Sequence, residues 1–171
     1  MKVYLDTNIV SALAKDDMPA ERGALDRLLE FSDVGKLKLV TSEITRREIQ
    51  KLDSIPNIDK DKRHLNVVYR LLEKVEFVED HRLLGIHSYG DRYTWINSPL
   101  IEDDPISSAL RQIGLDKTDA HHLMLAIRAG CEVFLTCDVR TILKYRREIE
   151  SQFSTIKLRK PSELITELER S

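Results

Sequence analysis

The sequence predicts an α/β fold, a three-layer sandwich in which helices flank a central, mostly parallel β-sheet. Short apolar runs typical of strands alternate along the chain with longer segments whose apolar residues recur at helical spacing. Strands joined by helices form parallel sheets that are covered on both faces. The chain has 171 residues, of which 42% are hydrophobic and 33% charged, so we expect a single domain, 1–171, with a buried core.

The first half of the chain is expected to begin with a strand and a short helix. Pro19 favours the start of a longer helix, whose leucine face continues until Gly35 ends it. Thr41 and Ser42 supply a cap for the next helix, which Pro56 breaks. The expected strands are residues 2–5, 36–40 and 75–78, and the expected helices are residues 7–14, 19–35, 43–52 and 61–74.

The second half contains a segment without a clean period, residues 80–99, which holds Tyr89, Tyr93 and Trp95. A packed surface loop is the favoured interpretation of these aromatic residues, and stacking on unpaired bases is the alternative. Helices are expected at residues 101–113, 116–129 and 139–150 and after Pro161, and strands are expected at residues 132–136 and 155–158.

Two apolar strands run directly into an aspartate, the first into Asp6 and the strand at 132–136 into Asp138. Ligands of open parallel sheets bind beyond the carboxyl ends of the strands, so acids placed there converge on one crevice. Several carboxylates without bases among them cannot all stay ionised unless a cation joins them. The arrangement therefore predicts a divalent-metal site, and hence chemistry on phosphates.

Each aspartate also has an ordinary structural interpretation. Asp6 and Asp138 precede expected helices, where Asp is a favoured N-cap, and taken singly each is more often a cap than a ligand. Asp119 lies three residues after Asp116, as in a cap followed by an acid in the first turn. For Asp119 alone, the structural and functional interpretations have equal weight.

The helix at residues 43–52 offers two glutamates. Glu48 lies on the stripe of Ile44, Ile49 and Leu52, which should face the sheet. Glu43 shares its face with polar residues, which indicates solvent. A carboxylate on the buried side needs a partner because an unpaired buried charge is costly. Glu48 is therefore the stronger candidate for the site.

Four segments together resemble the signature segments of PIN domains, and they occur in the order that family requires. They are Leu5-Asp6-Thr7-Asn8, Ser42-Glu43-Ile44-Thr45-Arg46-Arg47-Glu48-Ile49, Thr118-Asp119-Ala120-His121-His122-Leu123 and Phe134-Leu135-Thr136-Cys137-Asp138. The resemblance covers most of the chain and implies a metal-dependent nuclease fold. Residues 56–114 match no motif and form a segment longer than in compact toxin-type members, so we expect a variable insertion there.

The resemblance assigns the four acids as Asp6, Glu48, Asp119 and Asp138, supported by the polar residues Thr7, Asn8 and Thr136. Oxygen ligands suit Mg²⁺ or Mn²⁺, and such an ion promotes attack of water on phosphorus. The three aspartates are expected to be the principal ligands, and Glu48 binds a second metal or orients water. One metal or two remains open. The polar residues are expected to hold the carboxylates by hydrogen bonds.

Two sets of basic residues flank the expected ligands and could contact the phosphates of a nucleic acid. Such stripes are most often solvated helix faces, but their place beside the acids favours substrate binding. The net charge is −2, yet the 27 bases outweigh the acids once four of the 29 acids are assigned to metal. The sets are Arg140, Lys144 and Arg147, and Arg46, Arg47 and Lys51.

His122 lies one turn from Asp119, and a polar residue near the site or a core histidine is the favoured interpretation over a ligand or base. Zinc-type spacing of His and Cys is absent from the sequence. Cys131 and Cys137 bracket one strand, roughly 20 Å apart if extended, too far for a disulfide. Without a secretory signal or membrane span, we expect a cytoplasmic protein.

The function expected from these features is a metal-dependent endoribonuclease that hydrolyses RNA phosphodiester bonds. A toxin restrained by an antitoxin-like protein and a processing nuclease both stay open, as does a homodimer. The alternative is an inactive PIN-like module that binds RNA or a protein. Two other classes of protein do not fit the sequence. A phosphatase of the haloacid-dehalogenase type would need a second Asp at the position of Asn8. A receiver-type phosphoacceptor would need paired acids before its phosphorylated aspartate and a lysine at a later strand end, and the sequence lacks this pattern.

Overall fold

The computed structural model describes residues 1–12, 19–53, 68–69, 71–78 and 104–170. Its elements alternate between strands and helices, as the sequence predicts. In chain order they are β1 (Lys2–Leu5), α1 (Thr7–Ala12), α2 (Pro19–Asp33), β2 (Lys38–Ser42), α3 (Glu43–Asp53), β3 (Glu76–Val78), α6 (Pro105–Ile113), α7 (Lys117–Arg128), β4 (Val133–Leu135), the 3₁₀ helix η2 (Leu143–Tyr145), α8 (Arg146–Gln152), β5 (Lys157–Arg159) and α9 (Pro161–Glu169).

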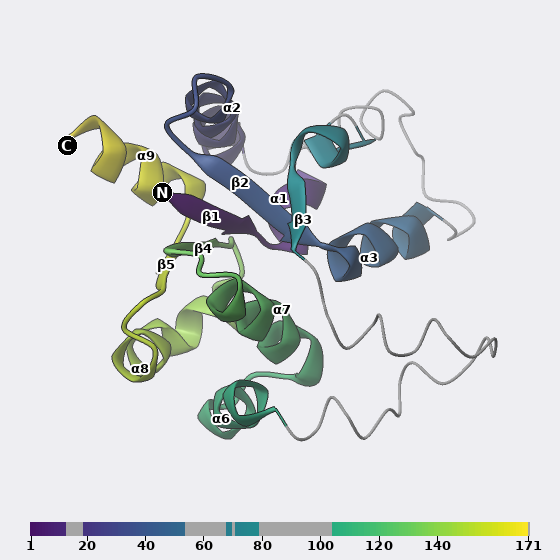
Figure 1. Ribbon diagram of the computed structural model, residues 1–171, viewed down its shortest axis with the longest axis vertical. Coiled ribbons are helices and arrows are strands. Elements are labelled where there is room, and N and C mark those ends of the chain that lie inside the picture. The colour runs from purple at the N-terminus through teal and green to yellow at the C-terminus, as the bar shows by residue number, and fades with distance from the viewer. Residues whose placement is uncertain (13–18, 54–67, 70, 79–103, 171) are drawn as a thin grey trace.

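The five strands form one sheet in the order β3-β2-β1-β4-β5, and all neighbouring pairs are parallel (Figure 1). The predicted α/β sandwich with a parallel sheet is confirmed. From β1 the chain moves outward to β2 and β3, and it then returns to place β4 on the other side of β1. The order therefore reverses between β1 and β4, which is where open parallel sheets bind their ligands.

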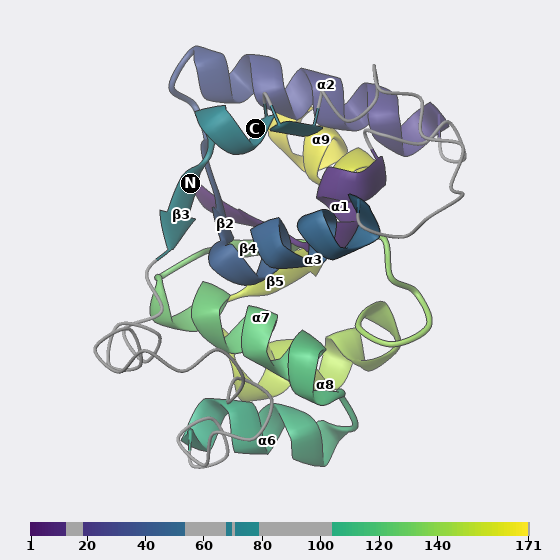
Figure 2. The ribbon, with the colours of Figure 1, turned by 90° about the vertical axis from the view of Figure 1, so that its right-hand side faces the viewer.

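Alternation along β1 divides the core into two halves. Val3 and Leu5 belong to an apolar cluster with Leu25 and Leu28 of α2 and Leu164 of α9. The intervening Tyr4 belongs to a second cluster, which includes residues of α6, α7 and α8. Helices thus cover both faces of the sheet, with α2 and α9 on one side and α6, α7 and α8 on the other (Figure 2). This sandwich fixes the strand ends that carry the acids.

The helix predicted at residues 139–150 begins later than expected. Turns follow β4 as far as Ile142, the single turn of η2 comes next, and α8 begins only at Arg146. The Asp138 carboxylate caps the first turn, as its ordinary interpretation held, because its Oδ1 accepts hydrogen bonds from the backbone N–H groups of Arg140 and Thr141 at 2.9 and 2.8 Å. The chain then forms the single turn of η2 before α8 begins, so no α-helix starts directly from this cap.

Other predicted boundaries shift by a few residues. The second strand runs through Ser42 rather than ending at Val40, and α3 follows it without a separate capping residue. The last strand is Lys157–Arg159 rather than residues 155–158. Within the segment 56–114, β3 pairs with β2 and α6 packs on α7, so parts of that segment belong to the sandwich.

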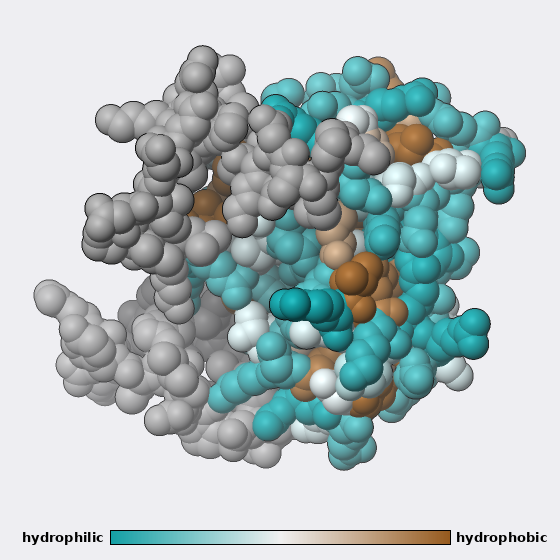
Figure 3. Space-filling view, turned by 180° about the vertical axis from the view of Figure 1, so that it is seen from behind, coloured by the Kyte–Doolittle hydropathy of each residue, from teal (hydrophilic) through white to brown (hydrophobic). Residues whose placement is uncertain are grey.

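Residues 80–99, with Tyr89, Tyr93 and Trp95, lie outside the described residues. Figure 3 shows the molecule from behind the view of Figure 1. The described part of this face is mostly hydrophilic, and hydrophobic residues are scattered over it. Among the described helices, none is long and apolar enough to cross a membrane.

Candidate active site

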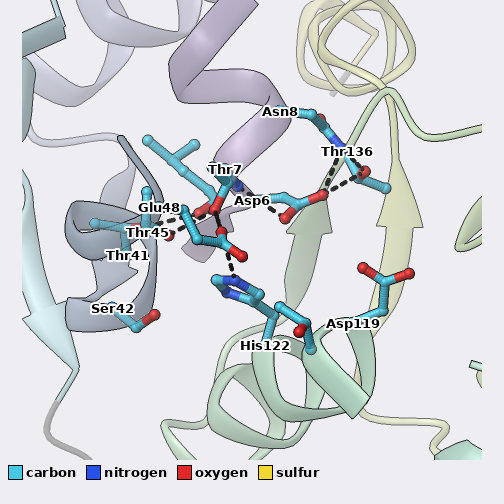
Figure 4. Close-up of polar contacts among 12 residues, drawn as sticks. Asp6, Thr7, Asn8, Thr41, Ser42, Thr45, Glu48, Asp119, His122 and Thr136 are labelled. Carbon is cyan, nitrogen blue, oxygen red and sulfur yellow. Dashed lines mark hydrogen bonds and ion pairs between the residues drawn. The ribbon is translucent and has the colours of Figure 1, made fainter. Parts of the chain in front are cut away.

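The candidate site lies where β1 and β4 end side by side in the sheet. Leu5 pairs with Leu135, and the backbone N–H of Asp6 donates to the Leu135 carbonyl at 3.1 Å. Asp6 follows β1 and Asp138 follows β4, so both acids lie at the same end of the sheet, as the sequence predicts. Glu48 reaches this end from α3 and Asp119 from α7 (Figure 4).

Asp6 is held by the residues predicted to support it. Its Oδ1 accepts the backbone N–H of Thr7 at 2.8 Å, and its Oδ2 accepts the Asn8 amide at 2.6 Å and the Thr136 hydroxyl at 2.8 Å. The Asn8 amide also donates to the Thr136 hydroxyl at 2.8 Å, and its oxygen accepts the backbone N–H of Cys137 at 3.0 Å. These contacts tie the end of β1 to the end of β4 and leave Asp6 only 4% exposed.

Burial raises the pKa of Asp6 above its ordinary value of 3.8, although the neighbouring His122 and the hydrogen bond from Thr136 oppose the rise. The negative charge of Glu48 adds to it. Asp6 is therefore a carboxylate whose ionised form would gain from a nearby cation.

Glu48 faces the site as predicted from the apolar stripe of α3. The Thr7 hydroxyl donates to Glu48 Oε2, and the same oxygen lies 3.3 Å from Nε2 of His122. Glu43 points elsewhere, since its carboxylate pairs with Arg46 at 2.8 Å. The two glutamates thus occupy different sides of α3, and Thr7 connects Glu48 to the strand end that carries Asp6.

Asp119 is half-buried in the first turn of α7, after the N-cap residue Asp116. Burial raises the pKa of Asp119 from 3.8 to about 6, and the negative charges of Asp116, Asp6 and Asp138 add to the rise. Thr141 links this acid to Asp138, because its hydroxyl donates to Asp138 Oδ2 at 2.6 Å and its hydrogen bonding opposes the rise for Asp119.

Asp138 differs from the other acids because the turn after β4 already uses both of its oxygens. Partial burial works against its ionisation, but hydrogen bonds from Thr141 and Arg140 hold the pKa of Asp138 below its ordinary value. This carboxylate has a structural role whatever else it does.

The donor set is suited in its chemistry to a hard divalent cation, since it consists of carboxylates supported by hydroxyls and an amide. Asp6 and Asp119 have pKa values raised by burial and by neighbouring acids, which a cation would reverse. Within the described ranges, however, no three His, Cys, Asp or Glu side chains are grouped closely enough to hold a metal ion as they stand. Water ligands, which Mg²⁺ commonly keeps, would have to complete the coordination of an ion held by these residues.

The basic residues predicted to bind substrate are placed differently from the expectation. Arg140 lies in the turn before η2, Lys144 in η2 and Arg147 in α8, so the three do not share one helical face. Arg46 is engaged with Glu43 and lies over the Phe77 ring at 4.0 Å. The other two members of that set, Arg47 and Lys51, are carried by α3.

Sequence reasoning did not anticipate the contacts of Tyr4 and Thr141 with the site, and it did not identify Glu48 as the partner of His122. A signal existed for Tyr4, because a tyrosine that alternates with Val3 and Leu5 in a buried strand must find a partner for its hydroxyl. Thr141 is a neighbour of the acids because the turn after β4 brings its backbone N–H and its hydroxyl to Asp138.

The raised pKa of Asp119 predicts a pH dependence of stability. Between 3.8 and about 6 the folded protein binds more protons than the unfolded chain, so its free energy of unfolding should fall as the pH rises through this range. Asp119→Asn should make that decrease smaller, leaving the part that the raised pKa of Asp6 contributes. Urea unfolding of the metal-free wild type and variant across this range checks it, and parallel pH profiles for the two proteins would contradict it.

Comparisons with known proteins agree with the described fold. The family model described as "PIN domain" matches residues 3–148. One similar solved structure is the crystal structure of VapBC2 from Rickettsia felis bound to a DNA fragment from their promoter, with 15% sequence identity, a TM-score of 0.55 and coverage of 94% of this chain and 98% of that chain. At this identity the likeness shows the fold alone. No curated protein matches the chain.

Proposed function

Because the chain belongs to the PIN domain family, whose members are generally nucleases, we propose that it is a metal-dependent endoribonuclease that hydrolyses RNA phosphodiester bonds. The proposal is supported by the positions of Asp6, Glu48 and Asp119, which follow β1 or lie on α3 and α7 at the end of the sheet where the strand order reverses. Two of these acids, Asp6 and Asp119, have pKa values raised by burial and by neighbouring acids. A divalent cation would offset both the cost of burying these carboxylates and the repulsion between them.

We assign Asp6, Glu48 and Asp119 as the residues that hold Mg²⁺ or Mn²⁺. Asp138 is a further ligand that also keeps its hydrogen bonds to the turn after β4. When bound, the ion supplies positive charge that makes water more acidic and offsets charge on the phosphate. Thr136 and Asn8 orient Asp6, and Thr7 orients Glu48 through its hydroxyl. These hydrogen bonds restrict the carboxylates to one arrangement before substrate arrives.

The proposed substrate is RNA, and Arg140, Lys144 and Arg147 remain candidates to contact its phosphates. All three are exposed and follow Asp138 in the chain, although they come from three different local structures. Their contribution would come from charge near the site rather than from a helical stripe.

For the cellular role, we propose a toxin that an antitoxin-like protein restrains, with a processing nuclease as the second candidate. The likeness to VapBC2, a toxin–antitoxin structure, favours the toxin. A short neighbouring gene for a DNA-binding protein, whose product co-purifies with this chain and blocks cleavage, would support it. Full activity in the presence of that product would favour processing.

The test of the activity compares wild type with Asp6→Asn, purified identically, on a panel of structured and single-stranded RNAs. We expect Mn²⁺-dependent cleavage that EDTA stops and that Asp6→Asn lowers by about 100-fold or more, because the variant loses a charged ligand. Mn²⁺ should also raise the melting temperature of wild type more than that of the variant.

Equal cleavage by wild type and Asp6→Asn would contradict the proposal, because it would assign the activity to another site or to a contaminant. Metal-independent RNA binding without cleavage would favour the inactive PIN-like module instead.

A further inference from the structure

A buried chain of polar contacts leads from the core of the sheet to Glu48. The Tyr4 hydroxyl, which is fully buried in β1, lies 2.7 Å from the Ser42 hydroxyl and 2.7 Å from Nδ1 of His122. On the other edge of the imidazole ring, His122 Nε2 lies 3.3 Å from Glu48 Oε2 (Figure 4 labels all but Tyr4). The chain of contacts joins two strands and two helices to one carboxylate of the proposed site.

A protonated His122 ring donates from both nitrogens, and a neutral ring has one arrangement of protons that satisfies every contact. The Tyr4 hydroxyl has a single proton, which it can donate to only one of its two partners. If Tyr4 donated to Ser42, Nδ1 would have to donate to Tyr4, and the bare Nε2 would face the Glu48 oxygen as a second acceptor. With Ser42 donating to Tyr4 and Tyr4 donating to Nδ1, the Nε2–H group donates to Glu48 and every contact is satisfied.

We propose that His122 is a positioning residue for Glu48, and that the Tyr4 hydroxyl holds the imidazole in the tautomer that donates to this carboxylate. The inference rests on the proposed function, since it assigns His122 a task in that same site. It gives a specific task to a histidine that the sequence indicated as a polar residue near the site or a core histidine.

The burial of the two partners explains why such a support is needed. The His122 side chain is 2% exposed, whereas the Glu48 side chain is 31% exposed and belongs to a flexible residue type. A fixed donor reduces the set of rotamers that Glu48 samples and therefore the cost of arranging it for metal or water. The Tyr4 ring, whose hydroxyl contacts the imidazole, is itself held in place because it stacks on Phe134 with the ring centroids 5.2 Å apart.

Helix α7 would in this way position two acids of the proposed site, Asp119 directly and Glu48 through His122. Asp119 projects from its first turn, and His122, one turn later on the same face, reaches Glu48 of α3. A displacement of α7 would move both groups together. This coupling explains a histidine at a buried position where an apolar residue would pack as well.

The first test replaces the ring while keeping its volume. His122→Leu is expected to lower Mn²⁺-dependent RNA cleavage by about 10–100-fold and to raise the Mn²⁺ concentration needed for half-maximal rate, the usual effect of losing a support for a ligand. The KM for RNA should change little. His122→Gln, whose side-chain amide can still donate to Glu48, should restore most of the loss.

The second test is a double-mutant cycle. If His122 acts through Glu48, His122→Leu should have almost no further effect on cleavage in a Glu48→Gln background. Tyr4→Phe keeps the ring stack and removes the hydroxyl, so it should produce a smaller loss of the same kind. His121→Gln, at the neighbouring position of α7, is the matched control and should cleave as wild type does.

A measurement without substrate completes the design. Nitrogen NMR of the His122 ring in the metal-free protein should show a protonated Nε2 and an unprotonated Nδ1. An unprotonated Nε2 would overturn the inference, as would wild-type cleavage by a folded His122→Leu or full additivity with Glu48→Gln. Loss of cleavage in Asp6→Asn with full activity in His122→Leu would reject this inference alone, whereas a wild type with no metal-dependent cleavage would reject the proposed function.

Discussion

Glu48→Gln is expected to lower Mn²⁺-dependent RNA cleavage by about 100-fold or more, whereas Glu43→Gln should keep most of the wild-type rate. The two residues belong to the same helix and differ in direction. Glu48 accepts from Thr7 and lies 3.3 Å from His122, beside Asp6. Glu43 pairs with Arg46 on a side of the helix that faces away from these contacts. The two substitutions therefore make the same chemical change once inside the proposed site and once outside it.

The fold should survive Glu48→Gln, because the amide oxygen still accepts one hydrogen bond and removal of a charge near Asp6 relieves repulsion. The melting temperature of the metal-free variant should stay at or above the wild-type value, and Mn²⁺ should raise it less than it raises wild type. Cleavage rates and melting curves with and without Mn²⁺ measure both effects. Full activity in Glu48→Gln together with loss in Glu43→Gln would show that the second acid is misassigned.

Asp104→Ala is expected to destabilise the fold strongly although it lies outside the site, by about 2–4 kcal/mol. The Asp104 side chain is fully buried and accepts the backbone N–H groups of Ile106 and Ser107 at 2.8 and 3.2 Å. Its second oxygen pairs with Arg128 at the end of α7, at 2.5 Å. Alanine would leave two N–H groups of α6 and one guanidinium without this partner.

Asp116→Ala provides the matched control, because Asp116 caps α7 with the same two-bond geometry, at 2.8 and 2.9 Å, but is exposed. Water can replace its contacts, so the expected loss is about 1 kcal/mol. Urea unfolding of both variants gives the comparison. Equal losses would mean that burial and the ion pair with Arg128 contribute little to the attachment of α6.

Local features of the sequence were enough to determine the strands and the acids that follow them. The alternation of Val3, Tyr4 and Leu5 sends neighbouring side chains to opposite faces, and the carboxyl ends of parallel strands meet at one edge. The apolar stripe of α3 decided which glutamate points to the site, since helical periodicity fixes relative direction within one element. The four segments that resemble PIN domains are confirmed as signs of that family by the match over residues 3–148.

The tertiary structure alone decided what happens after β4. A basic residue every third or fourth position is compatible with a helix, but after the cap at Asp138 the chain forms turns and the 3₁₀ helix η2 before α8 begins at Arg146. The predicted stripe of Arg140, Lys144 and Arg147 fails for this reason. Where a helix begins after a strand depends on how the segment packs in the fold, which periodicity does not encode.

Contacts between distant segments were also decided only by the fold. Tyr4, Glu48 and His122 come from three elements, and His122 finds Glu48 74 residues away along the chain. Buried polar groups must be satisfied, so the sequence implies that Tyr4 and His122 have partners. Which partners they are follows from the packing of α3 and α7 against the sheet, because that packing sets the distances between atoms that the order of residues leaves free.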